Sequence, residues 1–135
     1  MRGLTTLLRL ARGRSEDLRA GLVAATQERE AAMAELSSHD RAAAAEDTAA
    51  AGDPAVLADW AAWVATASRE RQALARATEV LAAREAEARD QVREGLAEAK
   101  RLEMALEAAV QAARNQARRR LQVAAEETEL RRPKA

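Results

Sequence analysis

The feature that most constrains the fold is a seven-residue repeat of mainly small and apolar residues along two segments of the chain. Its positions alternate four and three residues apart in the first segment, and three and four in the second. A repeat averaging 3.5 residues keeps one side of each helix facing a partner helix, as in a coiled coil. We call the repeat positions the seam; they are Leu4, Leu8, Ala11, Ser15, Leu18, Leu22, Ala25, Arg29, Ala32, Leu36, His39 and Ala43, then Leu57, Trp60, Val64, Ala67, Arg71, Leu74, Thr78, Leu81, Glu85, Ala88 and Val92.

The two segments are separated by Gly52-Asp53-Pro54. Gly52 suits the left-handed conformation after a helix end, Asp53 is a good N-cap, and Pro54 fits the first helical position. Such a short connection favours two antiparallel neighbours. We therefore predict an all-α fold, a two-helix antiparallel coiled-coil hairpin with a longer second helix that overhangs at the C-terminus. The single hairpin 1–135 has helix one at about 2–48, the turn at about 49–53, helix two at about 54–130 and a frayed C-terminal tail.

A turn near Gly52 places Leu4 opposite the region of Leu102, so helix two overhangs from about residue 105. Along the overhang an apolar stripe recurs at helical spacing. Its members are Leu106, Val110, Ala113, Ala117, Leu121 and Ala124, and the arginines around it are Arg114, Arg118, Arg119 and Arg120. A stripe without a partner in its own chain predicts a partner elsewhere, and weak self-association of two overhangs fits the pattern equally well.

Composition narrows the classes of protein. Alanine supplies 38 of 135 residues and Lys, Arg, Asp and Glu supply 44, which is typical of coiled coils. Absence of cysteine excludes disulfides and thiolate metal sites. No stretch approaches the roughly 20 apolar residues of a membrane span, and the N-terminal apolar run is too short for a signal peptide. The expected compartment is the cytoplasm, with no membrane span.

Charge is balanced overall but unevenly distributed. Residues 1–20 carry five Arg against two acids, a net charge of +3, and residues 100–135 carry nine Lys or Arg against five acids, a net charge of +4. Residues 28–90 carry thirteen acids against seven Arg, a net charge of −6. A hairpin brings both basic ends together, which would orient the molecule toward a partner. An ordinary charged helix surface explains the same counts.

No residue set predicts an enzyme, a cofactor site or a metal site. His39 is the only histidine, so metal-binding histidine pairs and independent Ser-His-acid sets are excluded. No glycine-rich phosphate loop occurs. We interpret His39 as a partly exposed seam residue rather than a pH sensor.

Trp60 and Trp63 open helix two beside the turn. Trp60 lies on the seam and Trp63 one step off it, so we expect them to clamp the end of helix one; the alternative is an anchor for a partner at the tip. Nucleic-acid binding is not expected, because the chain lacks aromatic stacking platforms and its acidic middle opposes a polyanion.

Three segments resemble the FliJ family of flagellar export proteins. They are the basic helix start Leu4-x-x-Leu7-Leu8-Arg9-Leu10-Ala11-Arg12, then Trp60-Ala61-Ala62-Trp63 leading into Arg69-Glu70-Arg71-Gln72-Ala73-Leu74, and Glu98-Ala99-Lys100-Arg101-Leu102-Glu103. The resemblance covers nearly the whole chain through degenerate coiled-coil patterns.

Members of that family are small cytoplasmic antiparallel coiled coils that resemble the stalk of rotary ATPases. The resemblance implies a non-enzymatic coupling protein of type III export in flagellum biogenesis and motility, located in the cytoplasm at the inner face of the cell membrane. Its implied partners are the export ATPase ring, the cytoplasmic domain of the export gate, and export chaperones. Ring contact would fall to Arg9, Arg12, Arg114, Arg118, Arg119 and Arg120. A related injectisome needs the same kind of rod.

Two other functions fit the sequence. The first is a generic structural scaffold that self-associates through its C-terminal overhang. The second is a membrane-surface helix that uses Leu4, Leu7, Leu8 and Ala11, with Arg2, Arg9 and Arg12 around them.

Overall fold

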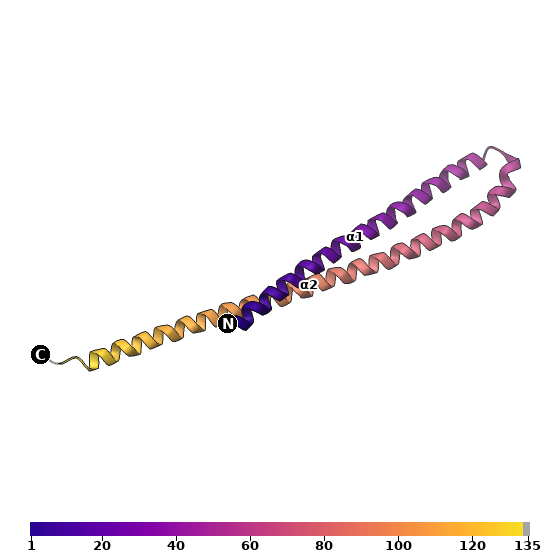
Figure 1. Cartoon of the computed structure of the whole chain (residues 1–135). Coiled ribbons are helices and arrows are strands. Elements are labelled where there is room, and N and C mark those ends of the chain that lie inside the picture. The colour runs from indigo at the N-terminus through magenta and orange to yellow at the C-terminus, as the bar shows by residue number, and fades with distance from the viewer. Residues whose placement is uncertain (134–135) are drawn as a thin grey trace. The chain divides into compact units, whose positions relative to one another are not determined.

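The computed structural model describes residues 1–133, the side chain of Pro54 excepted, and consists of helices joined by one turn. Helix α1 spans Arg2–Ala50, a 3-10 helix η1 spans Pro54–Val56, and α2 spans Leu57–Leu130 (Figure 1). The described chain is thus all-α and forms a helical hairpin, as predicted from the heptad repeat. The last two residues of the expected frayed tail, Lys134 and Ala135, lie outside the described residues.

The turn is built by Asp53. Its carboxylate Oδ1 accepts a hydrogen bond from the backbone N–H of Ala55 at 2.9 Å, so the expected N-cap is confirmed. Its own N–H donates to the carbonyl of Ala50 at 3.3 Å, and its carbonyl accepts from Val56 at 3.2 Å. These two hydrogen bonds join residues three apart and tighten the chain into the 3-10 helix η1, so α2 begins at Leu57.

The left-handed conformation expected at Gly52 is wrong, because no described glycine has a positive φ. The bond from Asp53 to Ala50 keeps the chain in right-handed turn geometry through this position. The end of α1 is therefore closed by a 3-10-like step, without a glycine cap of the left-handed kind.

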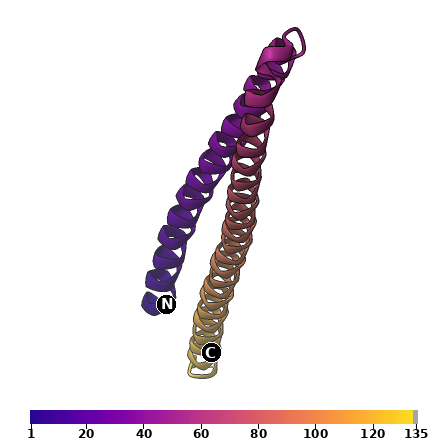
Figure 2. The ribbon, with the colours of Figure 1, turned by 90° about the vertical axis from the view of Figure 1, so that its right-hand side faces the viewer.

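Contacts divide the chain into two units, which we call the hairpin unit (Asp17–Arg93) and the terminal unit (Met1–Glu16 with the chain from Glu94 onward). In the hairpin unit, successive cross-helix contacts join Arg29 to Glu85, Asp40 to Arg71, and Asp47 to Trp60. Through these three contacts the residue numbers rise on α1 and fall on α2. The helices of this unit are therefore antiparallel, and both ribbon views show α1 running to the turn and α2 running back from it (Figures 1 and 2).

In the terminal unit, the start of α1 supplies three well-buried residues of the described chain. Leu8 is 5% exposed, Ala11 1% and Ser15 5%. Arg14 reaches across to Glu98 of α2, with Nη2 and Oε1 3.4 Å apart. On α2 of this unit, the three-four alternation continues beyond Val92 through a buried Gly95 and partly buried Ala99, Leu102, Leu106 and Ala109.

Burial confirms the predicted seam. All twelve seam residues of α1 are at least partly buried, and nine of the eleven on α2 are too, so the heptad repeat locates the packed faces. The exceptions are Leu57, the first residue of α2 beside the turn, and Arg71, which reaches out to Asp40. The seam is nevertheless thin, because within residues 1–133 no large apolar side chain is fully buried, and Leu8, at 5% exposed, is the most buried of the seam leucines. Stability therefore rests on few large contacts.

Across the described residues, no helix combines the length and the apolar character that crossing a membrane requires.

Candidate partner-binding surface

The end of α2 is an unpaired helix. Every residue from Gln111 to Pro133 is exposed, and we call this stretch the C-terminal extension. It carries large apolar side chains in open solvent: Leu121 is 72% exposed, Val123 52% and Leu130 86%. The N-terminal segment of α1 shows the opposite pattern, with Leu8 and Ala11 buried. The extension is thus the longest stretch of helix in the described chain without a buried face.

The predicted overhang began too early. Leu106, Ala109 and Val110 are partly buried, so the exposed stretch starts at Gln111 rather than at about 105. The predicted apolar stripe is therefore divided. Leu106 and Val110 prolong the seam of the terminal unit, while the free part of the stripe consists of Ala113, Ala117, Leu121 and Ala124. These four are three or four residues apart and so share one face of the helix.

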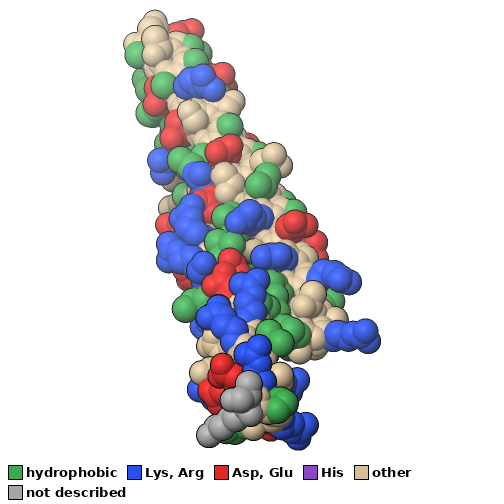
Figure 3. Space-filling view, turned by 90° about the vertical axis from the view of Figure 1, so that its left-hand side faces the viewer, with side chains coloured by type: hydrophobic (Ala, Val, Ile, Leu, Met, Phe, Trp, Pro, Cys, Tyr) green, Lys and Arg blue, Asp and Glu red, His purple; other side chains and the backbone are tan. Residues whose placement is uncertain are grey.

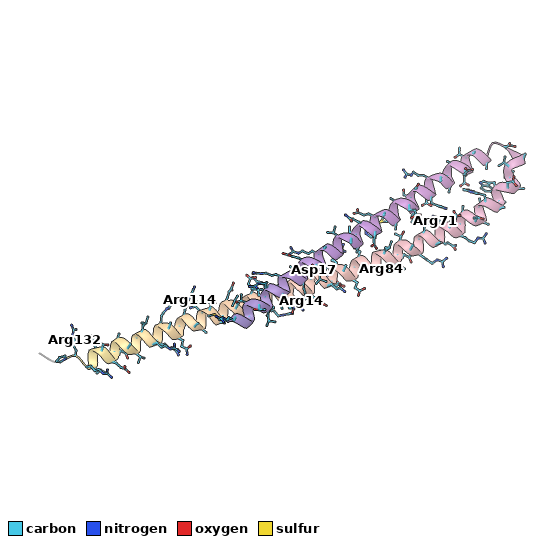
Figure 4. The ribbon with its side chains drawn as sticks, in the orientation of Figure 1. Arg14, Asp17, Arg71, Arg84, Arg114 and Arg132 are labelled. Atoms are coloured by element: carbon cyan, nitrogen blue, oxygen red, sulfur yellow. The ribbon has the colours of Figure 1, made fainter. Side chains whose placement is uncertain are left out.

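Four arginines lie on the same turns of helix as the free stripe. Arg114, Arg118, Arg119 and Arg120 are all exposed, and the structure shows none of the four in an ion pair with another described residue. Figure 4 shows Arg114 projecting from α2, and basic side chains are prominent on the face drawn in Figure 3. Because the stretch from Ala108 to Ala125 contains no acid, this part of the extension presents uncompensated positive charge.

Net charge follows the two units. The terminal unit has thirteen Lys or Arg against eight acids, a net charge of +5, and the hairpin unit has nine Arg against fourteen acids, a net charge of −5. The expectation that the basic N-terminal and C-terminal segments belong together is met at the level of the unit. Arg9 and Arg12 are exposed on α1 of the terminal unit. The cross-helix ion pair of that segment is made by Arg14, which the sequence did not single out.

The charged centre of the hairpin unit lies on the seam itself. The Glu85 carboxylate, 8% exposed, accepts hydrogen bonds from Nε of Arg29 and, at 2.7 Å, from Nη2 of Arg89. The hydrogen bond from Arg29 and the charges of both arginines lower the pKa of Glu85, against the opposing effect of desolvation. The same hydrogen bond raises the pKa of Arg29. An ion pair at this depth fixes which residues of α1 and α2 face each other, as polar seam residues do in coiled coils.

His39 lies beside the carboxylate of Glu70 in the same unit. Its Nε2 is 3.5 Å from a carboxylate oxygen of Glu70, and its side chain is 18% exposed, so it is a partly exposed seam residue as interpreted. Its Nδ1 is buried without a hydrogen-bond partner. An open groove lined by Glu35, Ser38 and Leu74 runs past it. Within residues 1–133, no three His, Asp or Glu side chains are grouped closely enough to hold a metal ion.

The tryptophans lie at the turn end of the hairpin unit. Trp60 is half-buried, and its indole N–H donates to Oδ1 of Asp47 on α1 at 3.0 Å. Trp60 thus ties the two helices together, which is the role the sequence favoured for it. Trp63 is also half-buried.

Comparison with protein-family models, with curated proteins and with solved structures found no match to this chain.

The C-terminal extension is the candidate functional site, because it combines a long exposed apolar face with arginines that form no ion pair with another described residue. The N-terminal face considered for a membrane surface is not free, since Leu8 and Ala11 are buried in the terminal unit.

Proposed function

We propose that this protein is a non-enzymatic coupling protein that binds a partner through its C-terminal extension. The observation that carries the proposal is the exposed stretch 111–133, helical to Leu130, where Leu121 is 72% exposed in an apolar stripe flanked by arginines. An isolated helix of this length is marginal in water, so its apolar face gains stability when a partner covers it. Exposed arginines beside an apolar patch are favoured interface residues.

The resemblance to flagellar export proteins gives this partner a specific form. We propose that the extension meets an export ATPase ring, and that the protein couples the ring to the export gate and to export chaperones. This function places it in the cytoplasm at the inner face of the cell membrane. The supporting features are the helical hairpin, the net charge of +5 on the terminal unit and the free arginines of its C-terminal extension.

The test is co-elution with the export ATPase encoded in the same genome, followed by light scattering. The triple variant Arg118→Glu, Arg119→Glu, Arg120→Glu should abolish co-elution while the helical circular dichroism signal stays unchanged. A matched control reverses Arg41, Arg76 and Arg84, three exposed arginines of the hairpin unit, and so changes the net charge by the same amount. The control should still bind. Binding by both triple variants, or by neither, would show that the extension's arginines are not the specific contact.

The membrane-surface alternative makes a separable prediction. Burial of Leu8 and Ala11 leaves the start of α1 without the free apolar face that interfacial helices insert. We therefore expect the protein to stay at the bottom of the gradient in a flotation assay with anionic vesicles. Flotation with the vesicles would favour the membrane helix over the coupling protein.

A further inference from the structure

The charges are segregated along the helical part of the C-terminal extension, which ends at Leu130. Its first half carries Arg114, Arg118, Arg119 and Arg120, and its second half carries Glu126, Glu127 and Glu129; Arg131 and Arg132 follow the end of the helix. None of these acids forms an ion pair with another described residue. A helix whose two halves have opposite charge is complementary to itself when a second copy runs in the opposite direction.

The charges are also sorted around the helix. At 100° per residue, Arg114, Arg118 and Glu129 lie on one flank of the apolar stripe, and Arg120 and Glu127 lie on the other. Arg119 and Glu126 fall on the far side of the helix from the stripe. Each flank of the stripe thus has both signs, with arginine toward the start of the extension and glutamate toward its end.

We propose that two copies of this protein pair through their C-terminal extensions, antiparallel, about a two-fold axis near residue 122. This inference rests on the proposed role of the extension as an interaction surface and names a second copy as its occupant in the absence of another partner. In this register Leu121 of each copy lies opposite Ala124 of the other. Ala117 lies opposite Thr128, so each copy covers the other's stripe from Ala117 to Ala124, while Ala113 falls opposite Arg132 beyond the end of α2.

The flanks agree with the same register. In an antiparallel helix pair, the same flank of each helix faces its counterpart. Arg120 of one copy then faces Glu127 of the other, twice by symmetry. Arg114 of one copy lies near both Glu129 and Arg131 of the other, so it adds no net attraction. A parallel pair in register would place arginine against arginine and glutamate against glutamate.

The exposed length fits as well. The register pairs residues 115–130 of both copies, all of which are exposed and helical. The partly buried Ala109 and Val110 lie outside the paired stretch. Pairing leaves the seam of the terminal unit undisturbed.

Self-pairing would regulate the proposed coupling function. It covers the stripe from Ala117 to Ala124 and neutralises Arg120, so a copy in the pair cannot present the extension to an ATPase. The paired form and the partner-bound form exclude each other. Because the stripe is mostly alanine, the pair is weak and yields readily to a stronger partner.

The first test is sedimentation equilibrium of the full-length chain, without a partner, from roughly 10 μM to 1 mM, the range of weak association. The mass should rise from 14.6 kDa toward twice that value. Arg120→Glu and Glu127→Lys should each weaken association roughly 10-fold, since each removes two ion pairs and adds two repulsions. The double variant carrying both changes should restore it, and Glu126→Lys on the far face should have no effect. A mass that stays at 14.6 kDa throughout, or equal weakening by Glu126→Lys, would overturn the proposal.

The second test fixes the direction of pairing. Because the natural chain has no cysteine, single cysteines can be introduced without background. Ala117→Cys and Thr128→Cys should form an intermolecular disulfide when the two variants are mixed, and neither should do so alone. Disulfide dimers of each variant alone would show a parallel pair and refute the proposed register.

The outcome is separable from that of the coupling function. A protein that self-associates as described but never co-elutes with the ATPase would retain the pairing and lose the export role. A monomer that binds the ATPase through Arg118–Arg120 would do the reverse.

Discussion

Truncating Leu8 to alanine should destabilise the terminal unit far more than the same change at Leu10. Leu8 is 5% exposed and Leu10 is 56% exposed, on the same turns of α1. Leu8→Ala removes three buried carbon atoms, about 2–3 kcal/mol of transfer free energy, with a small cavity cost because two helices can close the gap. Leu10→Ala removes atoms that are already mostly in water, which costs at most about 1 kcal/mol.

The assay is hydrogen exchange of backbone amides in residues 5–16, read peptide by peptide. A loss of 2–3 kcal/mol speeds exchange from the opened state roughly 30- to 150-fold, whereas Leu10→Ala should speed it at most about 5-fold. The hairpin-unit residues 29–47 serve as an internal reference and should be unaffected by either change. Equal acceleration by both variants would refute the reasoning, because it would show that Leu8 has no buried contact to lose.

Three further predictions concern the hairpin unit. The lowered pKa of Glu85 means that its charged form stabilises the fold above the unfolded pKa of about 4.3, and that this contribution is lost as pH falls through the lower folded pKa. Glu85→Gln should therefore reduce stability at pH 7 and flatten the loss of helicity on acidification, while Glu87→Gln at an exposed neighbour should do neither. Asp53→Ala should lower the free energy of unfolding by about 0.5–2 kcal/mol in urea, with Asp53→Asn retaining most of it, since the cap to Ala55 is lost only in the first. Trp60→Phe should cost about 0.5–1.5 kcal/mol through the lost hydrogen bond to Asp47; no change in urea midpoint would mean that this bond is not formed in solution.

The sequence predicted the packed faces well because heptad spacing is a direct consequence of helix geometry. Once Leu4 and Leu8 set the phase, burial at Ala11, Ser15 and Leu18 follows from the period alone. The same three-four spacing continued past Val92 predicts the buried position of Gly95 as well.

Local sequence patterns do not predict details that depend on contacts between distant residues. No local signal sets the point at which α2 becomes fully exposed, because it depends on where α1 starts and on the register between the helices. The prediction of a left-handed conformation at Gly52 was wrong, because the hydrogen bond from Asp53 to Ala50 closes the end of α1 in another way. The sequence likewise does not predict that Glu85 pairs with Arg29, since the two residues lie 56 positions apart.

The candidate surface was predicted in outline but not in its limits. The arginines and the stripe were evident from spacing, and the structure shows that Leu106 and Val110 are partly buried while Leu121 is free. The segregation of charge along the extension was present in the sequence as well. It becomes an argument for antiparallel pairing only once the exposed length, 111–133, is known.

The most direct test of the central claim is hydrogen exchange of residues 111–130 in dilute protein, alone and with a saturating amount of the export ATPase. Alone, this stretch should exchange much faster than residues 60–106, because nothing packs on it. With the ATPase it should become protected while the rest of the chain changes little. Full protection in the protein alone, or no gain of protection with the ATPase present, would contradict the account of the C-terminal extension as a partner-binding surface.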